Sequence, residues 1–249
     1  MKKMFYRKEA TLFAFIGVIS LAILVYGYQS SANLGAITVH VPYANTAVFW
    51  NNEEVRLTTA TDQEVVVGRV APGEQSVLVY KEGYYPWEKT MYMREGEKAD
   101  IFPFLVRENP GQHEVDPAIF ANVIPPNGKK VSASGAIAVD NANGKIYAIR
   151  LTDDKSTLFC GYEHETETCY ETVVVLDIQQ TINNVDFYPD RDDVILFSTK
   201  DGLYAIEIDG RGTRNFQPIY EGSTDGFLVN KRTSSIYVKN GQSSFQVLP

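Results

Sequence analysis

Residues 183–222 read NNVDFYPDRDDVILFSTKDGLYAIEIDGRGTRNFQPIYEG, and this stretch decides the fold. It holds short runs rich in Val, Ile, Leu, Phe and Tyr, and Pro, Gly, Asp or Asn residues typical of tight turns separate these runs. The pattern predicts strands of roughly four to seven residues joined by hairpins. We therefore expect an all-β structure here.

The same pattern continues on both sides, over residues 132–249. Residues 135–151 read GAIAVDNANGKIYAIRL, in which Asn143-Gly144 is a strong signal for a two-residue type I′ turn. Residues 226–248, GFLVNKRTSSIYVKNGQSSFQVL, form a further partial unit. The segments repeat at about 40 residues and resemble the blades of WD40-like or TolB-like β-propellers.

The length of this region limits the number of blades. At about 40 residues each, residues 132–249 supply about three blades, whereas closed propellers have about four to eight. We expect an incomplete propeller-like array of antiparallel blades, which either stays open or closes with another chain. An open array exposes an apolar sheet face, and such a face marks a site for a protein partner or for self-association.

A separate series of short strands is predicted over residues 35–106. AITVHV at 36–41, EVVVGRV at 64–70 and QSVLVY at 75–80 alternate apolar and other side chains, with turn residues between the runs. Pro72-Gly73 predicts a type II turn, because proline fixes φ at the first corner and glycine permits positive φ at the second. The pattern indicates a β-sandwich of about 70 residues.

Three pieces of this region carry a family resemblance. VAPGEQSVLV at 70–79, KEGYYPWEK at 81–89 and the Glu95-Gly96-Glu97 turn resemble a PEGA domain in their order and spacing. The family's name describes a Pro-Glu-Gly-Ala turn, and this chain has Pro-Gly-Glu-Gln instead. The resemblance implies an extracytoplasmic β-sandwich of prokaryotic surface proteins, and it implies no catalytic residues.

The two β regions are joined by residues 107–131, RENPGQHEVDPAIFANVIPPNGKKV. Pro110-Gly111 and Pro125-Pro126 interrupt regular structure. We expect a linker here, with one short helical turn near residues 117–122.

The N-terminal residues predict a single membrane span over 11–28. Residues 12–28 read LFAFIGVISLAILVYGY, carry no charge, and would extend roughly 25 Å as a helix. Four basic residues lie in the preceding segment 1–10, and the first basic residue after the span is Arg56. This asymmetry places residues 1–10 in the cytoplasm and everything after a short tether, 29–34, outside it.

A cleaved signal peptide is the alternative to a retained signal anchor. Ser30-Ser31-Ala32 supplies small residues for cleavage, although the apolar run is longer than a typical signal-peptide core and Ala-x-Ala is absent. Either reading exports the rest of the chain, so the expected location is the cell membrane or its outer side.

Charge excludes one class of partner. The chain has net charge -8, and without residues 1–28 it retains 19 basic and 30 acidic residues. No basic stripe could neutralise phosphates, so nucleic acid is not expected as a partner.

The chain has two cysteines, Cys160 and Cys169, on either side of GYEHETET. Outside the cytoplasm this pair predicts a disulfide. Two free thiols, or a metal site that uses His164 with Glu163 and Glu165, are the alternatives. Zinc sites favour closer cysteine pairs.

Few residues suggest a chemical role. Tyr84, Tyr85 and Trp87 could stack on sugar rings, while core and edge packing is the competing explanation. The sequence has no Gly-x-Ser-x-Gly elbow, HExxH helix, P-loop or dinucleotide fingerprint. Asp190, Asp192 and Asp193 lack the distal Glu and bend Gly of a calcium loop. No enzyme activity, metal or cofactor is predicted.

The sequence therefore predicts a membrane-anchored extracytoplasmic adaptor that mediates protein–protein interaction at the cell envelope. A carbohydrate or cell-wall binding module is the alternative. Retention on cell-wall polysaccharide through Tyr85 and Trp87 would distinguish the two.

Overall fold

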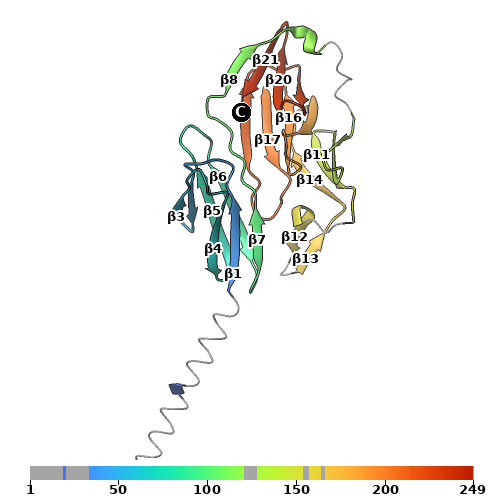
Figure 1. Ribbon diagram of the computed structural model, residues 1–249. Coiled ribbons are helices and arrows are strands. Elements are labelled where there is room, and N and C mark those ends of the chain that lie inside the picture. Colours follow the sequence, from blue (N-terminus) through green and yellow to red (C-terminus); the bar gives the residue numbers. More distant parts are fainter. Residues whose placement is uncertain (1–18, 21–33, 121–127, 154–156, 164–165, 249) are drawn as a thin grey trace, which may run out of the picture.

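The computed structural model describes residues 19–20, 34–120, 128–153, 157–163 and 166–248, and strands dominate this part of the chain (Figure 1). The predicted all-β architecture is confirmed. The predicted cytoplasmic segment 1–10, membrane helix 11–28 and tether 29–34 lie outside these residues, apart from helical Ile19 and Ser20 and residue 34. Within the described ranges, no helix combines the length and apolar character that a membrane crossing needs.

The N-terminal unit consists of two sheets that share a core between them. One sheet has the order β4 (Glu64–Val70), β1 (Gly35–His40), β7 (Lys98–Ile101), and its β1–β7 pair is parallel. The other has the order β3 (Glu53–Leu57), β2 (Ala47–Trp50), β5 (Gly73–Tyr80), β6 (Trp87–Met93) and is antiparallel. Alternating side chains of β1, β4, β5 and β6 are buried, as expected for strands with one face on a core.

The corner at Pro72 carries the chain from one sheet to the other. Strand β4 ends at Val70 in the first sheet, and β5 begins at Gly73 in the second. Gly73 has a φ of 123°, a conformation that glycine adopts readily and other residues avoid. The predicted turn is therefore a crossing between sheets.

The C-terminal array contains three antiparallel four-stranded sheets. The first array sheet has the order β14 (Thr172–Asp177), β11 (Lys145–Arg150), β10 (Ile137–Ala142), β9 (Lys130–Val131). The second has β15 (Asn184–Phe187), β16 (Val194–Thr199), β17 (Gly202–Glu207), β18 (Phe216–Glu221). The third has β19 (Gly226–Asn230), β20 (Ser235–Asn240), β21 (Ser243–Leu248), β8 (Gly111–Glu114). The Asn143-Gly144 turn joins β10 to β11 with φ values of 52° and 75°, which confirms the type I′ prediction.

The segment predicted as a linker does more than connect. It contains β8, which pairs antiparallel with β21 and completes the third array sheet, and a short 3-10 helix η1 (Pro117–Phe120). The predicted helical turn is present, but the prediction that this segment contains no regular strand was wrong. All four residues of β8 are exposed, so it has no apolar side that could reveal it.

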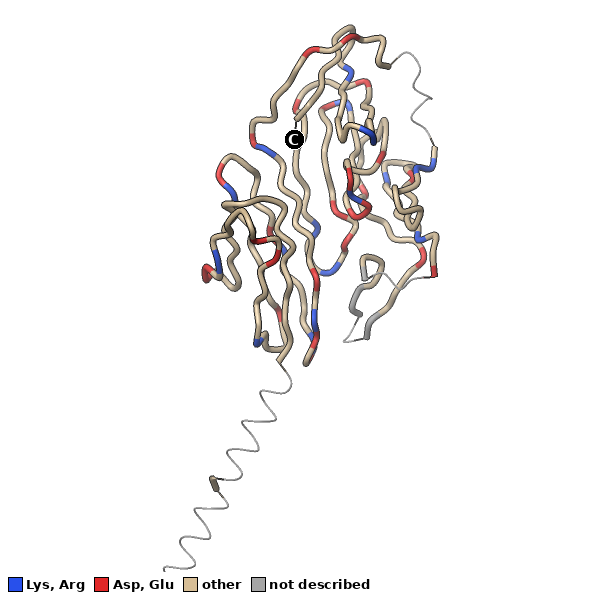
Figure 2. The backbone as a smooth tube through the Cα atoms, viewed as in Figure 1, with Lys and Arg blue, Asp and Glu red and all other residues tan. Residues whose placement is uncertain are grey.

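Two hydrophobic cores hold the described chain together. One lies between the first and second array sheets. The other includes the N-terminal unit, residues 104–106 and the facing sides of the second and third array sheets. Because this second core is continuous, the N-terminal unit and the array pack against each other, and Figure 2 shows their tubes side by side.

A small two-stranded hairpin stands apart from the main sheets. Strands β12 (Cys160–Glu163) and β13 (Thr166–Cys169) follow the 3-10 helix η2 (Thr157–Phe159) and are inserted between β11 and β14. In Figure 1 this hairpin hangs below the array, on the side toward the N-terminal unit.

Candidate functional site

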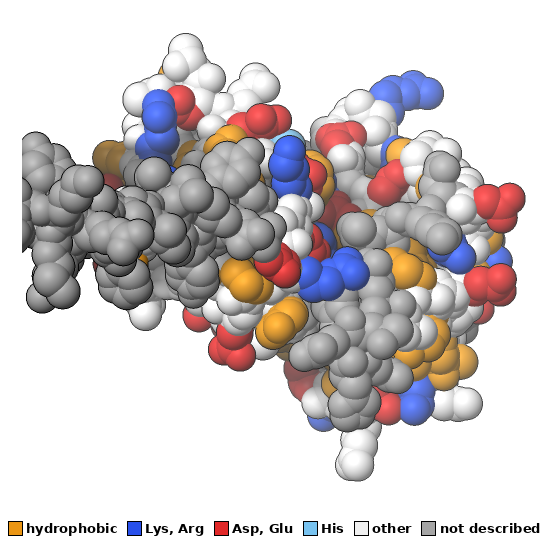
Figure 3. Space-filling model, turned by 90° about the horizontal axis from the view of Figure 1, so that it is seen from below, with side chains coloured by type: hydrophobic (Ala, Val, Ile, Leu, Met, Phe, Trp, Pro, Cys, Tyr) orange, Lys and Arg blue, Asp and Glu red, His pale blue; other side chains and the backbone are white. Residues whose placement is uncertain are grey.

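A cleft lies where the N-terminal unit meets the second array sheet. Its volume is about 390 Å³. Its apolar lining comes from Trp87, Phe102 and Leu158, and its charged lining includes Asp100 and Arg211. Figure 3, which views the molecule from below Figure 1, shows acidic, basic and apolar side chains interspersed among those that it colours by type.

A buried ion pair crosses this junction. Lys89 of β6 is fully buried, and its Nζ lies 2.7 Å from Oε1 of Glu207 at the end of β17. The ammonium also donates to the backbone oxygens of Asp209 and Thr213, at 3.2 and 3.3 Å. The indole nitrogen of Trp87 donates to the other oxygen of Glu207 at 3.3 Å. Desolvated charges are tolerated when they are paired and hydrogen-bonded in this way.

A second pair extends the same network. Arg211 donates from its side chain and its backbone amide to the carboxylate of Asp209, and it also reaches the backbone oxygen of Asp100 at 2.9 Å. Burial alone would raise the pKa of Asp209, but the hydrogen bonds from Arg211 and the charges of Lys89 and Arg211 outweigh burial and lower it. Asp209 is therefore a carboxylate at neutral pH.

The loop after β17 rests directly on the backbone of β6. Gly212 has a φ of +74°, and a Cβ at this position would overlap the carbonyl oxygen of Thr90. At the end of the loop, the side-chain amide of Asn215 accepts a hydrogen bond from the backbone nitrogen of Glu88 and donates one to its backbone oxygen, both at 2.9 Å. These contacts hold β6 and the second array sheet in one fixed relation.

Residues 102–106, which follow β7 and precede the predicted linker, reinforce this junction on the other side. The backbone nitrogen of Val106 donates to the side-chain oxygen of Gln217 at 2.8 Å, and Arg191 donates to the backbone oxygens of Phe102 and Pro103. Ligands of the cleft would therefore meet a wall fixed by these hydrogen bonds. Three of its acidic side chains, Glu207, Asp209 and Asp193, are already paired with Lys89, Arg211 and Arg191.

The structure does not bring together the three residues of the predicted aromatic platform, Tyr84, Tyr85 and Trp87. Trp87 is 1% exposed and belongs to the junction core, which agrees with the packing explanation and leaves no exposed ring face for a sugar. Tyr84 is half-buried, packs against Tyr43 with ring centres 5.3 Å apart and the rings tilted, and has Arg107 over its ring. Tyr85 is also half-buried and packs on the core. The three residues do not form one exposed surface.

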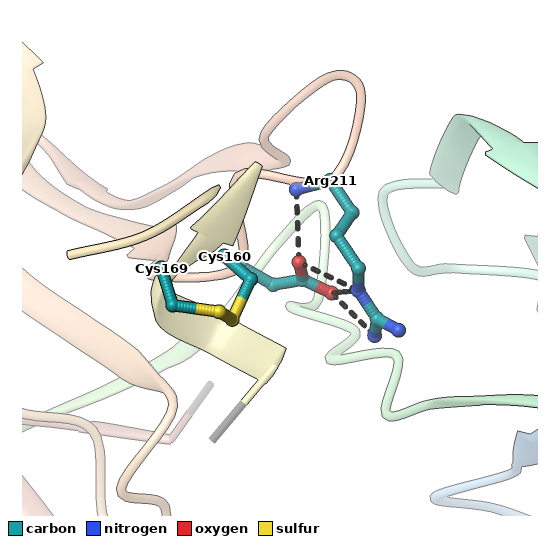
Figure 4. Close-up of a disulfide and its surroundings, with 4 residues drawn as sticks. Cys160, Cys169 and Arg211 are labelled. Atoms are coloured by element: carbon teal, nitrogen blue, oxygen red, sulfur yellow. Dashed lines mark hydrogen bonds and ion pairs between the residues drawn. A yellow bond between two sulfur atoms is a disulfide. The ribbon is translucent and has the colours of Figure 1, made fainter. Parts of the chain in front are cut away.

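The predicted disulfide between Cys160 and Cys169 is present. The two residues are directly opposite each other on β12 and β13, so the bond closes the hairpin at its base. Figure 4 shows the disulfide beside Arg211, next to the cleft. Two residues of the alternative metal site, His164 and Glu165, lie outside the described residues, and over the described ranges no group of three or more His, Cys, Asp or Glu could hold a metal ion.

A different surface lies on the first array sheet. Its inner side, which includes Ile137, Val139 and Ala148, packs toward the second array sheet. The opposite side of the same sheet includes the side chains of Val131, Tyr147, Ile149 and Val174. We call these four residues the end face. Val131 and Val174 are 43% and 44% exposed. The described strands form no fourth array sheet that could cover the end face.

The charged junction was missed by the sequence reasoning, although one signal for it exists. Trp87, Lys89, Met91 and Met93 alternate along β6 and are all buried. A lysine on the buried, apolar side of a strand requires a buried acceptor or carboxylate to pair with its charge. The partner is 118 residues away in sequence, and no local pattern identifies it.

Comparisons with protein-family models and with curated proteins find no match to this chain.

Proposed function

We propose that this protein is a membrane-anchored extracytoplasmic adaptor that binds a protein partner through the end face of its array. In this proposal the PEGA-like unit is a rigid spacer near the membrane, and the array is an incomplete propeller. The end face is the observation that carries the proposal.

The end face has the chemistry of a docking surface. Its four side chains are aliphatic or aromatic, and two of them keep more than two fifths of their surface exposed. Sheets pack face to face at a separation of about 10 Å, so a sheet of a partner could cover this face as the second array sheet covers the other one. Apolar surface of this kind is favourable to bury.

The location rests on two further observations. The basic residues before the apolar segment 12–28, with none after it until Arg56, favour an N-terminus in the cytoplasm. The Cys160–Cys169 disulfide suits an oxidising compartment outside the cytoplasm. Both agree with an anchor that delivers the β units to the outer side of the membrane.

A site-specific photo-crosslinker tests the docking surface in the full chain, expressed in its own membrane. The crosslinker replaces Val174 on the end face, and a matched chain carries it at Val66, which is 61% exposed on β4 of the N-terminal unit. We expect Val174 to give one discrete adduct that disappears when Val131→Glu places a charge on the same face. Adducts of equal yield from both positions, or an adduct unaffected by Val131→Glu, would refute the proposal.

The alternative of carbohydrate binding receives no support from the aromatic residues first suspected. Trp87 is enclosed and Tyr84 is engaged by Tyr43 and Arg107. Retention on purified cell-wall polysaccharide that is lost on Tyr85→Ala would restore this alternative.

A further inference from the structure

The junction brings an amine, an amide and a carboxylate together from two units of the chain. Lys89 Nζ lies 2.7 Å from Glu207 Oε1, and the side-chain nitrogen of Asn215 lies 3.1 Å from the same oxygen. Lys89 is fully buried, and the side chain of Glu207 is 5% exposed. The amine and the amide are thus held beside each other by one carboxylate oxygen.

The amide of Asn215 is fixed in a polarised arrangement. Its carbonyl oxygen accepts a hydrogen bond from the backbone nitrogen of Glu88 at 2.9 Å, and its nitrogen donates to the backbone oxygen of Glu88 and to Glu207. A donor aimed at the carbonyl oxygen stabilises the negative charge that develops there when a nucleophile attacks the carbon. Glu88 precedes Lys89 in β6, so this donor and the amine come from adjacent residues.

We infer that Lys89 and Asn215 form a covalent side-chain amide, with Glu207 as the proton carrier. Lys89 is fully buried and Asn215 is half-buried, and both contact the same oxygen of Glu207. Groups that a protein positions in this way react far faster than the same groups free in water. The bond would join β6 of the N-terminal unit to the start of β18 in the second array sheet. This modification is independent of the docking function proposed above.

The step balances without any other reactant. Glu207 Oε1 takes a proton from the Lys89 ammonium, and the neutral amine moves from that oxygen to the side-chain carbonyl carbon of Asn215, whose nitrogen donates to the same oxygen. The new carbon–nitrogen bond forms while Glu207 also relays a second proton from the attacking nitrogen, so the departing nitrogen of Asn215 receives two protons and leaves as an ammonium ion. The product keeps the carbonyl oxygen opposite the Glu88 amide, and Glu207 ends as a carboxylate.

Mass spectrometry of the full chain in detergent tests the inference directly. After reduction of the disulfide, we expect the intact mass to be lower than the sequence mass by one ammonia molecule. Trypsin cannot cut after an acylated lysine, so digestion should yield one branched peptide that joins residues 82–94 to residues 215–231. Lys89→Met and Glu207→Gln should each restore the sequence mass, and Lys98→Met, in the same cleft, should retain the loss of ammonia.

An Asn215→Asp variant sharpens the result, because the same bond would then form with loss of water instead of ammonia. The wild-type chain alone is decisive, whatever the variants do to folding. An unmodified mass with a linear peptide ending at Lys89 would overturn the inference. A lowered mass without the branched peptide would overturn it as well, because Asn215 alone can lose ammonia by cyclising.

Discussion

The contact between the Gly212 loop and β6 is the part of the structure that a single methyl group can test. Gly212→Ala places a Cβ where the carbonyl oxygen of Thr90 already lies, and the residue has a φ of +74°. Either β6 or the loop must move to accept the new atom. We expect the variant to open the junction between the N-terminal unit and the array.

The magnitude has two parts, and a matched glycine separates them. A left-handed conformation costs an alanine about 1–2 kcal/mol. Overpacking adds typically about 1–3 kcal/mol. Gly96 has a φ of +70° but no atom within 4 Å of an added Cβ, so Gly96→Ala carries only the first cost. The free energy of unfolding should therefore fall by about 1–3 kcal/mol more for Gly212→Ala than for Gly96→Ala.

Equilibrium denaturation monitored by tryptophan fluorescence measures this difference. The chain has two tryptophans, and Trp87 lies in the junction itself, so its emission reports on whether the interface is closed. Gly212→Ala should also shift the native emission of Trp87 to longer wavelength, which Gly96→Ala should not do. Equal losses of stability in the two variants would show that the loop does not rest on β6.

Three further predictions concern the same region. Replacing Cys160 and Cys169 by Ser should lower the free energy of unfolding by about 2–3 kcal/mol, since the disulfide closes a loop of about ten residues; denaturation with and without reductant should give the same loss in the wild type and none in the variant. Trp87→Ala should cost about 3–5 kcal/mol, as deletion of a buried aromatic ring does, and a loss below 1 kcal/mol in a urea titration would contradict the packing described. Folding lowers the pKa of the Asp209 carboxyl. The stability that this carboxylate contributes is therefore fully present above the pKa that Asp209 has in the unfolded chain, about 3.9, and it is lost as pH falls through the lower pKa of the folded state. Asp209→Asn should therefore reduce the loss of stability on acidification below about pH 4, which urea titrations at several acidic pH values would measure.

Strands with one apolar face were predictable from the sequence. In β1, in β4 up to Gly68 and in β5 from Gln75 on, buried and less buried residues alternate, so the alternation of residue types is visible without any knowledge of partners. The Asn143-Gly144 turn was predictable for a similar reason, because positive φ at two successive residues restricts the residue types. Strands β3 and β8 were not predicted. Every residue of these two strands is exposed, so neither strand has a buried side that would produce an alternating apolar pattern in the sequence.

The candidate site depends on contacts that local patterns do not encode. Lys89 and Glu207 are far apart in sequence, and their meeting follows from how the N-terminal unit packs on the second array sheet. The sequence left the role of Trp87 open, because its residue type suits either a sugar platform or a core, and only the tertiary packing decides between them. The disulfide was predictable because the chain offers a single pair of cysteines.

The position of β8 in the chain also shapes how the protein is made. This strand leaves the ribosome before the rest of the array, yet the strand that it pairs with, β21, follows every other described strand of the array in the chain. Contacts between residues so distant in sequence form slowly. The nascent chain therefore carries an unpaired β8 until β21 has been synthesised, and premature termination within β21 would deprive β8 of its only pairing strand in the described chain. Completion of the third array sheet thus acts as a check that the array has been synthesised through β21.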